Sequence, residues 1–239
     1  MSERQDNFIT EADLKPSSKS QIHIYNSALD EWQHSEEDIK LAYPFHLTTT
    51  NHSGKKEGMT GSLPNEIVSY EKVGSIKQFL QFAKFDLSAS QFQDNHRSEI
   101  RFLRSDVLVA DIDNDNKLHP EYWNDEKNRF TLDGFALMFE PYEYILKTSR
   151  NHQKQKIGSD GTIREPRDKF HAFFPMPDRI EDRGEYQELL EILQYFTKEE
   201  YEQNRLDIAI GASSQLFGHE DTQIYYNAGE CILELLNDI

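Results

Sequence analysis

Residues 102–115 read FLRSDVLVADIDND and give the strongest indication of the fold. The central part, 107–113, is a run of mainly apolar and β-branched residues that ends in two aspartates. Such a continuous apolar run is typical of a strand buried on both faces. Because residues two apart on a strand point to the same face, Asp111 and Asp113 are expected to project together from the strand end.

Asp111 and Asp113 have two interpretations when the residues are considered alone. Adjacent carboxylates repel each other, and their burial is costly unless a cation or a hydrogen-bond network compensates. Mg²⁺ or Mn²⁺ would compensate well, because hard divalent ions prefer carboxylate oxygens. Alternatively, the strand ends at Asp111 and the aspartates are solvated turn residues, since Asp and Asn are common in turns.

Two other acidic motifs can be compared with this stretch. An EF-hand loop starting at Asp111 needs glycine at its sixth position and glutamate at its twelfth, which are Asn116 and Tyr122. We therefore reject an EF-hand. A phosphatase of the haloacid-dehalogenase type would use Asp111 as nucleophile and Asp113 as acid/base, although that family usually has Thr or Val where Asp115 stands. It remains a rival hypothesis.

Strand and helix patterns alternate through the rest of the chain without an internal repeat. We expect strands at 21–28, 144–148, 170–174 (closed by Pro175 and Pro177) and 224–226, helices after Ser35, from Ser75 and over 183–197, a loop over 50–65, and either a strand or a helix at 231–236. This order predicts a mixed α/β (α+β) fold. Residues 1–20 are expected to form a flexible leader, and 21–239 a single domain.

Composition describes an acidic protein with enough aromatic residues for a core. The 239 residues carry a net charge of −17, and 12% of them are aromatic. There is no run of roughly 20 apolar residues, and the N-terminus lacks the apolar core of a signal peptide. A single cysteine, Cys231, excludes an internal disulfide and a Cys-rich zinc site. We expect a cytoplasmic protein with no membrane partner. The charge also disfavours nucleic acid as a first hypothesis.

The charge is unevenly distributed. Residues 144–171 carry seven basic and three acidic side chains, a net charge of +4, whereas 172–239 carry a net charge of −11. This basic segment is either an ordinary solvated loop or an anion-binding strip. Its basic residues are Lys147, Arg150, Lys154, Lys156, Arg164, Arg167 and Lys169.

Two further candidates follow the basic segment. Lys169 and His171 share one face of the strand KFHAFFP, opposite Phe170. A histidine on an apolar strand is more often a core residue, but its place beside Lys169 and Arg167 suits a polyphosphate. Asp207 stands between Leu206 and Ile208, where a turn or cap aspartate would look the same.

Taken in order, these motifs resemble the archaeo-eukaryotic primase superfamily, the primase-polymerases. That superfamily has a strand with Asp-x-Asp, a later strand with a small or polar residue-x-His, and a third apolar-Asp motif. The resemblance covers most of residues 70–220 and extends to a group found in phages and mobile elements of bacteria. The segments that carry it are FAKFD (82–86), DNHRS (94–98), FLRSDVLVADIDND (102–115), SRNHQKQKIG (149–158), PRDKFHAFFP (166–175), Leu206–Asp207 and Phe217–Gly218.

The resemblance implies a primase catalytic core. An N-terminal α/β module, about 21–100, would pack on an RRM-like module with a mixed or antiparallel sheet, about 101–239, with the active site between them. Asp111, Asp113 and Asp207 would hold two Mg²⁺ or Mn²⁺ ions. The residues expected to bind the nucleotide are His171, Lys169, Arg167, Arg150 and Ser149. The activity would be template-directed nucleotidyl transfer from NTPs or dNTPs on single-stranded DNA, in replication of a phage, plasmid or other mobile element.

The third motif departs from this pattern. Ala212 stands where related sequences usually carry a second acid, and Gln215 where they carry an arginine. One alternative is therefore a catalytically weakened replication or interaction module with the same fold. A second alternative is a metal-dependent phosphatase or nuclease. No Gly-rich phosphate loop of a helicase is present in the sequence, so a separate helicase or replication protein is the expected partner.

Overall fold

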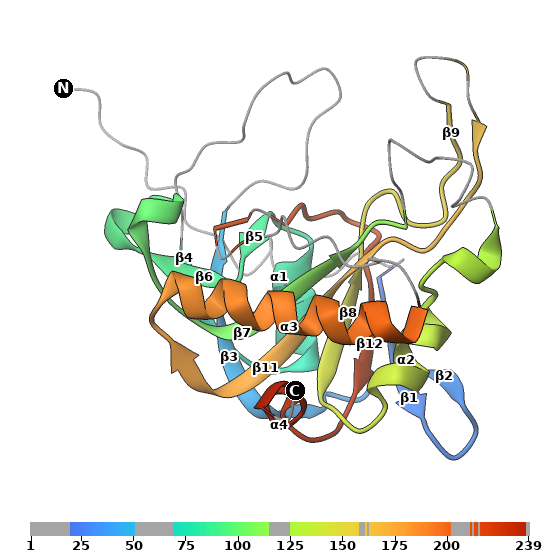
Figure 1. Cartoon of the computed structure of the whole chain (residues 1–239), viewed down its shortest axis with the longest axis horizontal. Coiled ribbons are helices and arrows are strands. Elements are labelled where there is room, and N and C mark those ends of the chain that lie inside the picture. Colours follow the sequence, from blue (N-terminus) through green and yellow to red (C-terminus); the bar gives the residue numbers. More distant parts are fainter. Residues whose placement is uncertain are drawn as a thin grey trace.

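The computed structural model describes residues 20–50, 69–114, 125–157, 161, 163–201, 211, 213–214 and 216–237. A mixed seven-stranded sheet forms the centre of the fold (Figure 1). Its strands β1 and β12 pair in parallel, and its other neighbours are antiparallel. In spatial order the strands are β2 (Glu31–Ser35), β1 (Gln21–Asn26), β12 (Gln223–Asn227), β8 (Tyr144–Thr148), β11 (Phe170–Ile180), β7 (Phe102–Ile112) and β6 (Ser90–Phe92).

A smaller, three-stranded sheet is built only from the first half of the chain. Its strands are β4 (Ser69–Ser75), β3 (Lys40–Thr49) and β5 (Leu87–Ser88), in that spatial order. Strands from the first hundred residues therefore contribute to both sheets, since β1, β2 and β6 belong to the large one. A short hairpin of β9 (Lys156–Ile157) and β10 (Ile163–Arg164) stands apart from both.

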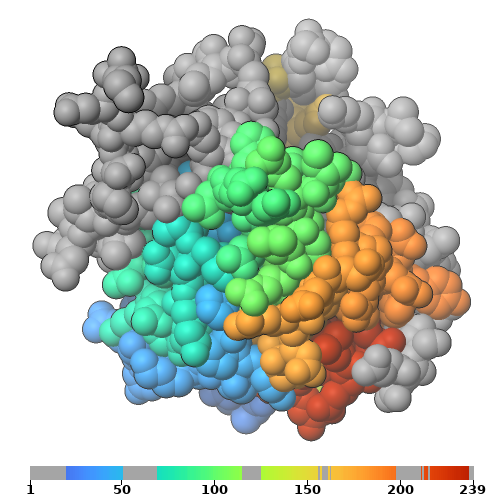
Figure 2. All heavy atoms as spheres, turned by 90° about the vertical axis from the view of Figure 1, so that its left-hand side faces the viewer, coloured from blue at the N-terminus to red at the C-terminus, as the bar shows by residue number. Residues whose placement is uncertain are grey.

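Helices cover both faces of the large sheet. On one face, α2 (Leu132–Phe139), α3 (Arg183–Tyr201) and α4 (Ile232–Asn237) share a core with β7, β8 and β11. On the other face, α1 (Ile76–Ala83) and the small sheet share a second core with the same strands. Figure 1 shows α3 crossing in front of the sheet and α1 behind it. Figure 2 shows residues 90–112 between the α1–β4 part and the β11–α3 part. Among the described residues, short 3₁₀ helices occupy Gln93–Asn95, Glu99–Arg101 and Glu126–Asn128.

The mixed α+β class and most of the expected elements are confirmed. The strand at 144–148 is β8, the strand at 224–226 is the centre of β12, and the helix expected from Ser75 is α1. The Ser75 hydroxyl accepts a hydrogen bond from the Gln78 amide and caps that helix. The ambiguous segment near the C-terminus is helical, as α4.

The helix expected after Ser35 is wrong. The chain forms β3 there, because Leu41, Phe45 and Leu47 alternate with more exposed residues and enter the core beneath α1. A helix would also have met Pro44, which interrupts helical hydrogen bonding.

The expected end of the 170–174 strand at its two prolines is also wrong. β11 continues to Ile180, and its pairing register with β7 shifts between Pro175 and Ile180. Prolines are tolerated in strands at such irregularities, because no ladder donor is required of them there. The expected leader and the 50–65 loop lie outside the described residues, apart from Ser20 and Thr50. No helix in the described part of the chain is long and apolar enough to cross a membrane.

Candidate active site

Three polar residues form a row across three neighbouring interior strands of the large sheet, β8, β11 and β7. His171 on β11 pairs with Asp111 on β7 and, on its other side, with Lys147 on β8. Directly opposed residues of antiparallel strands point to the same face, so the three side chains project together. On that face they continue the core formed by Val109, Ile145 and Phe173 and others. On each strand the polar residue lies two positions from an apolar core residue and so points to the same face as that residue.

Asp113 and Lys169 lie one step further along the same face. The Lys169 Nζ atom is 3.0 Å from the Asp113 Oδ1 atom. The Ser149 amide donates to the Lys169 carbonyl, which extends the β8–β11 pairing beyond the strand ends. Two motifs far apart in the sequence, Asp-x-Asp and Lys-x-His, thus meet side by side. The structure brings four of the expected site residues together.

His171 is a buried imidazole whose surroundings favour its neutral form. Burial lowers the pKa of His171 well below its ordinary value, and the charges of Lys147 and His219 act in the same direction. Its Nε2 atom is 3.5 Å from the Asp111 Oδ1 atom, longer than a normal hydrogen bond. Its Nδ1 atom is buried and has no hydrogen-bond partner. Buried polar atoms are nearly always paired, so this ring has unused hydrogen-bonding capacity.

Lys147 is a functional candidate that the sequence interpretation did not single out. Its side chain is fully buried, and the ammonium donates to the Phe217 carbonyl at 2.7 Å. Burial lowers the pKa of Lys147 to about 8, while the carboxylates of Asp86 and Asp111 act in the opposite direction. A lysine within the otherwise apolar segment YILKT was the available signal. Such a cation is tolerated only beside anionic or carbonyl partners.

A hydrogen bond between Asp86 and Gly218 holds the segment that contains Phe217 next to this row. The buried Asp86 carboxylate accepts a hydrogen bond from the Gly218 amide at 2.8 Å. A Cβ atom at Gly218 would lie 2.1 Å from the Lys84 carbonyl oxygen, so only glycine fits this approach. The segments FAKFD and Phe217–Gly218, which are remote in the sequence, are therefore in direct contact. Their contact lies beside Lys147.

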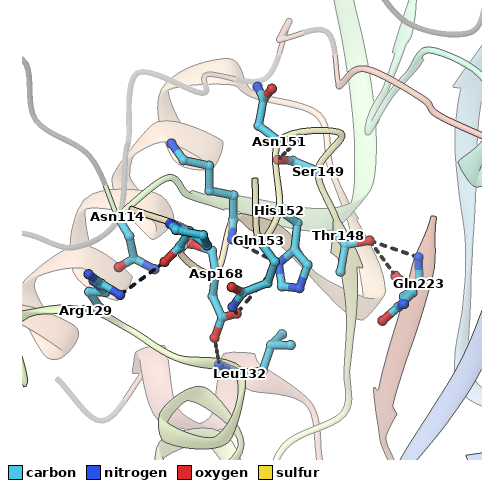
Figure 3. A network of polar contacts seen from close by, with 12 residues as sticks. Asn114, Arg129, Leu132, Thr148, Ser149, Asn151, His152, Gln153, Asp168 and Gln223 are labelled. Atoms are coloured by element: carbon cyan, nitrogen blue, oxygen red, sulfur yellow. Dashed lines mark hydrogen bonds and ion pairs between the residues drawn. The ribbon is translucent and has the colours of Figure 1, made fainter. Parts of the chain in front are cut away.

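A network of hydrogen bonds surrounds Asn114 and Asp168, the residues that adjoin Asp113 and Lys169 in the sequence (Figure 3). The Asn114 side chain, which is buried, donates to the carbonyls of Phe130 and Asp168 and accepts from the Phe130 amide. The Asp168 carboxylate accepts from the Leu132 amide and from the Gln153 side chain. Asn114 also has a positive φ of 47°, a conformation that Asn tolerates better than most residues. These contacts fix the chain on either side of the Asp113–Lys169 pair.

The other expected nucleotide-binding residues have structural contacts. The buried Arg167 guanidinium donates to the Asn114 carbonyl at 2.8 Å. The Arg150 guanidinium lies over the Phe217 ring, 5.5 Å from its centre. The Ser149 hydroxyl accepts from the Asn151 amide within the turn that follows β8. Arg150 and Ser149 lie at the same end of β8 as Lys147.

The residues present partly satisfy the requirements of a divalent metal site. Asp111 and Asp113 offer carboxylate oxygens on one face, and their side chains are 19% and 52% exposed. Within the described ranges, no group of three or more His, Cys, Asp or Glu side chains is arranged to hold a metal ion. The third expected ligand, Asp207, lies outside the described residues, as do Ala212 and Gln215. The described chain thus supplies two hard ligands of the expected kind.

Comparison with protein-family models, curated proteins and solved structures finds no match to this chain.

Proposed function

We propose that this chain is a metal-dependent nucleotidyltransferase of the primase-polymerase type, acting on single-stranded DNA template and NTPs or dNTPs. The observation that carries the proposal is the in-register pairing of Asp111 with His171, with Asp113 and Lys169 one step beyond. Two carboxylates that could bind a metal and two hydrogen-bond donors that could bind a polyphosphate would then lie on the same face of the large sheet. Phosphoryl transfer needs both kinds of group, because metal ions and hydrogen-bond donors together stabilise the charge on the reacting phosphates.

In this proposal Asp111 and Asp113, together with Asp207, would hold two Mg²⁺ or Mn²⁺ ions. The metal ions would supply activation of the primer hydroxyl and stabilisation of the leaving pyrophosphate. The chain's own residues would bind and orient the nucleotide. His171, neutral and with an unpaired ring nitrogen, would donate one hydrogen bond to a phosphate oxygen. Lys147 would keep its place in the row, because its ammonium already binds the Phe217 carbonyl.

The charge distribution supports a weak, local contact with DNA. The net charge is −17, and the basic segment 144–171, which runs from the start of β8 to the first residues of β11, supplies a net charge of +4. We therefore expect salt-sensitive DNA binding confined to the site, and a separate helicase or replication protein that tethers the chain to its template.

A synthesis assay tests the proposal. Wild-type protein, a single-stranded template, labelled NTPs or dNTPs and Mg²⁺ or Mn²⁺ should yield template-dependent primers or primer extension. Release of phosphate or degradation of the template without incorporation would instead identify the phosphatase or nuclease alternative and contradict the proposal.

A second candidate function is a replication or interaction module with the same fold and no turnover. The Asp113–Lys169 ion pair favours it, because one expected metal ligand is already neutralised by a lysine of the same chain. This candidate predicts no synthesis with either metal, together with measurable binding to single-stranded DNA. The synthesis assay therefore separates the two candidates.

A further inference from the structure

The two partners of the Asp113–Lys169 ion pair differ strongly in their access to solvent. The Asp113 side chain is 52% exposed, whereas the Lys169 side chain is only 4% exposed. A metal ion that arrives from solvent would therefore reach the Asp113 carboxylate directly. The ammonium of Lys169, in contrast, is enclosed by the protein.

The backbone of Lys169 is fixed on both sides. Its carbonyl accepts from the Ser149 amide at 2.8 Å, and its amide donates to the His152 Nδ1 atom at 3.2 Å. The Lys169 backbone is therefore held in place, and its buried side chain carries the ammonium to within 3.0 Å of the Asp113 carboxylate. A divalent ion bound to Asp113 would face this positive charge at short range, which opposes metal binding.

We propose that Lys169 couples metal binding to nucleotide binding by occupying Asp113 until a triphosphate replaces that carboxylate as its partner. The inference rests on the proposed function and concerns the same site. A triphosphate on the face shared by Lys169 and His171 would give the buried ammonium a new anionic partner. Asp113 would then be available to the metal, and each ligand would strengthen binding of the other.

The coupling can be measured without following synthesis. Mn²⁺ affinity is determined by calorimetry for wild type, Lys169→Met and Lys169→Arg, each with and without a non-hydrolysable nucleoside triphosphate analogue. We expect Lys169→Met to bind Mn²⁺ about tenfold more tightly than wild type when nucleotide is absent, within the usual range of such couplings. The gain in Mn²⁺ affinity caused by the analogue should shrink in Lys169→Met, and Lys169→Arg should retain the wild-type pattern.

Lys72→Met is the matched control, because Lys72 is exposed on β4 and the substitution removes the same charge. It should leave Mn²⁺ affinity unchanged. Thermal unfolding of each variant shows whether it is folded, and Lys169→Gln replaces Lys169→Met if the latter is not.

Two results would overturn the inference, and they are distinguishable. Equal Mn²⁺ affinity of wild type and Lys169→Met contradicts the coupling but leaves the proposed function intact. No Mn²⁺ binding by wild type, with or without the analogue, contradicts the coupling and the proposed metal-dependent function together.

Discussion

Asp111 and His171 occupy opposed positions on β7 and β11, and the Asp111 Oδ1 and His171 Nε2 atoms are 3.5 Å apart. Both are interior strands of the large sheet and are packed on both faces. Their separation is therefore set by the strand pairing and not by loop conformation. A site built on paired core strands holds its residues more precisely than one built on loops alone.

Gly218 is predicted to be intolerant of any side chain. A Cβ atom at this position would lie 2.1 Å from the Lys84 carbonyl oxygen, so Gly218→Ala must displace one of the two segments. We expect a loss of about 1–3 kcal/mol in the free energy of unfolding, as for other overpacked positions. Urea denaturation measures this loss. Gly211→Ala is the control, because its nearest neighbour would be the Gln187 side-chain oxygen at 3.7 Å, and equal effects of the two substitutions would refute the close approach.

Glu143 is predicted to stabilise the fold without taking part in the site. Its fully buried carboxylate accepts hydrogen bonds from the amides of Ala42 and Tyr43 and from the Tyr226 hydroxyl. Glu143→Ala would remove the shared acceptor of the buried Tyr226 hydroxyl and of two less buried backbone amides. We expect a destabilisation of about 1–3 kcal/mol. Glu140→Ala, at an exposed position after α2, should cost far less in the same denaturation experiment. A cost for Glu143→Ala no greater than for Glu140→Ala would be inconsistent with this role.

Stability is predicted to fall as the medium becomes acidic. Burial lowers the pKa of His219 to about 4, the charge of Lys147 acts in the same direction, and the ordinary value is 6.5. Between these two values the unfolded chain binds more protons than the folded one, so the free energy of unfolding decreases as pH falls through this window. His171 contributes in the same direction, because its pKa is also lowered.

This pH dependence can be assigned by substitution. Urea denaturation across the window should show a smaller loss of stability for His219→Gln than for wild type. His96→Gln, at a partly exposed position after β6, serves as the control and should follow wild type. If His219→Gln lost as much stability as wild type on acidification, the assignment to His219 would be incorrect.

The sequence predicted the parts of the fold that local pattern determines. The mainly apolar runs at 107–113 and 144–148 predicted strands. The second of them is β8, whereas the first is only the later part of β7, which begins at Phe102 and ends at Ile112. The region after Ser35 was predicted as a helix because its acidic residues resemble a first helical turn. The region forms a strand instead, because Phe45 and Leu47 pack in a core together with residues of α1 and β7. These packing partners are distant in the sequence, so the local pattern does not predict them.

The candidate site shows the same limit. Asp111, Asp113, Lys169 and His171 were identified from spacing on single strands, and their meeting follows from strand pairing. Lys147, Asp86 and Asn114 were missed as site residues, because each depends on partners that are distant in sequence: Phe217, Gly218 and Asp168. Their buried polar contacts appear only once the fold brings the segments together.

A double-mutant cycle of Asp111 and His171 in template-dependent synthesis tests the central claim most directly. Asp111→Asn and His171→Gln keep side-chain size while changing the chemistry of each partner. We predict that each lowers the rate by at least ~100-fold, and that the double variant is little worse than the poorer single variant, because residues that act as a unit are not additive. Wild-type rates in both single variants, with all proteins folded, would contradict the assignment of Asp111 and His171 to one catalytic site.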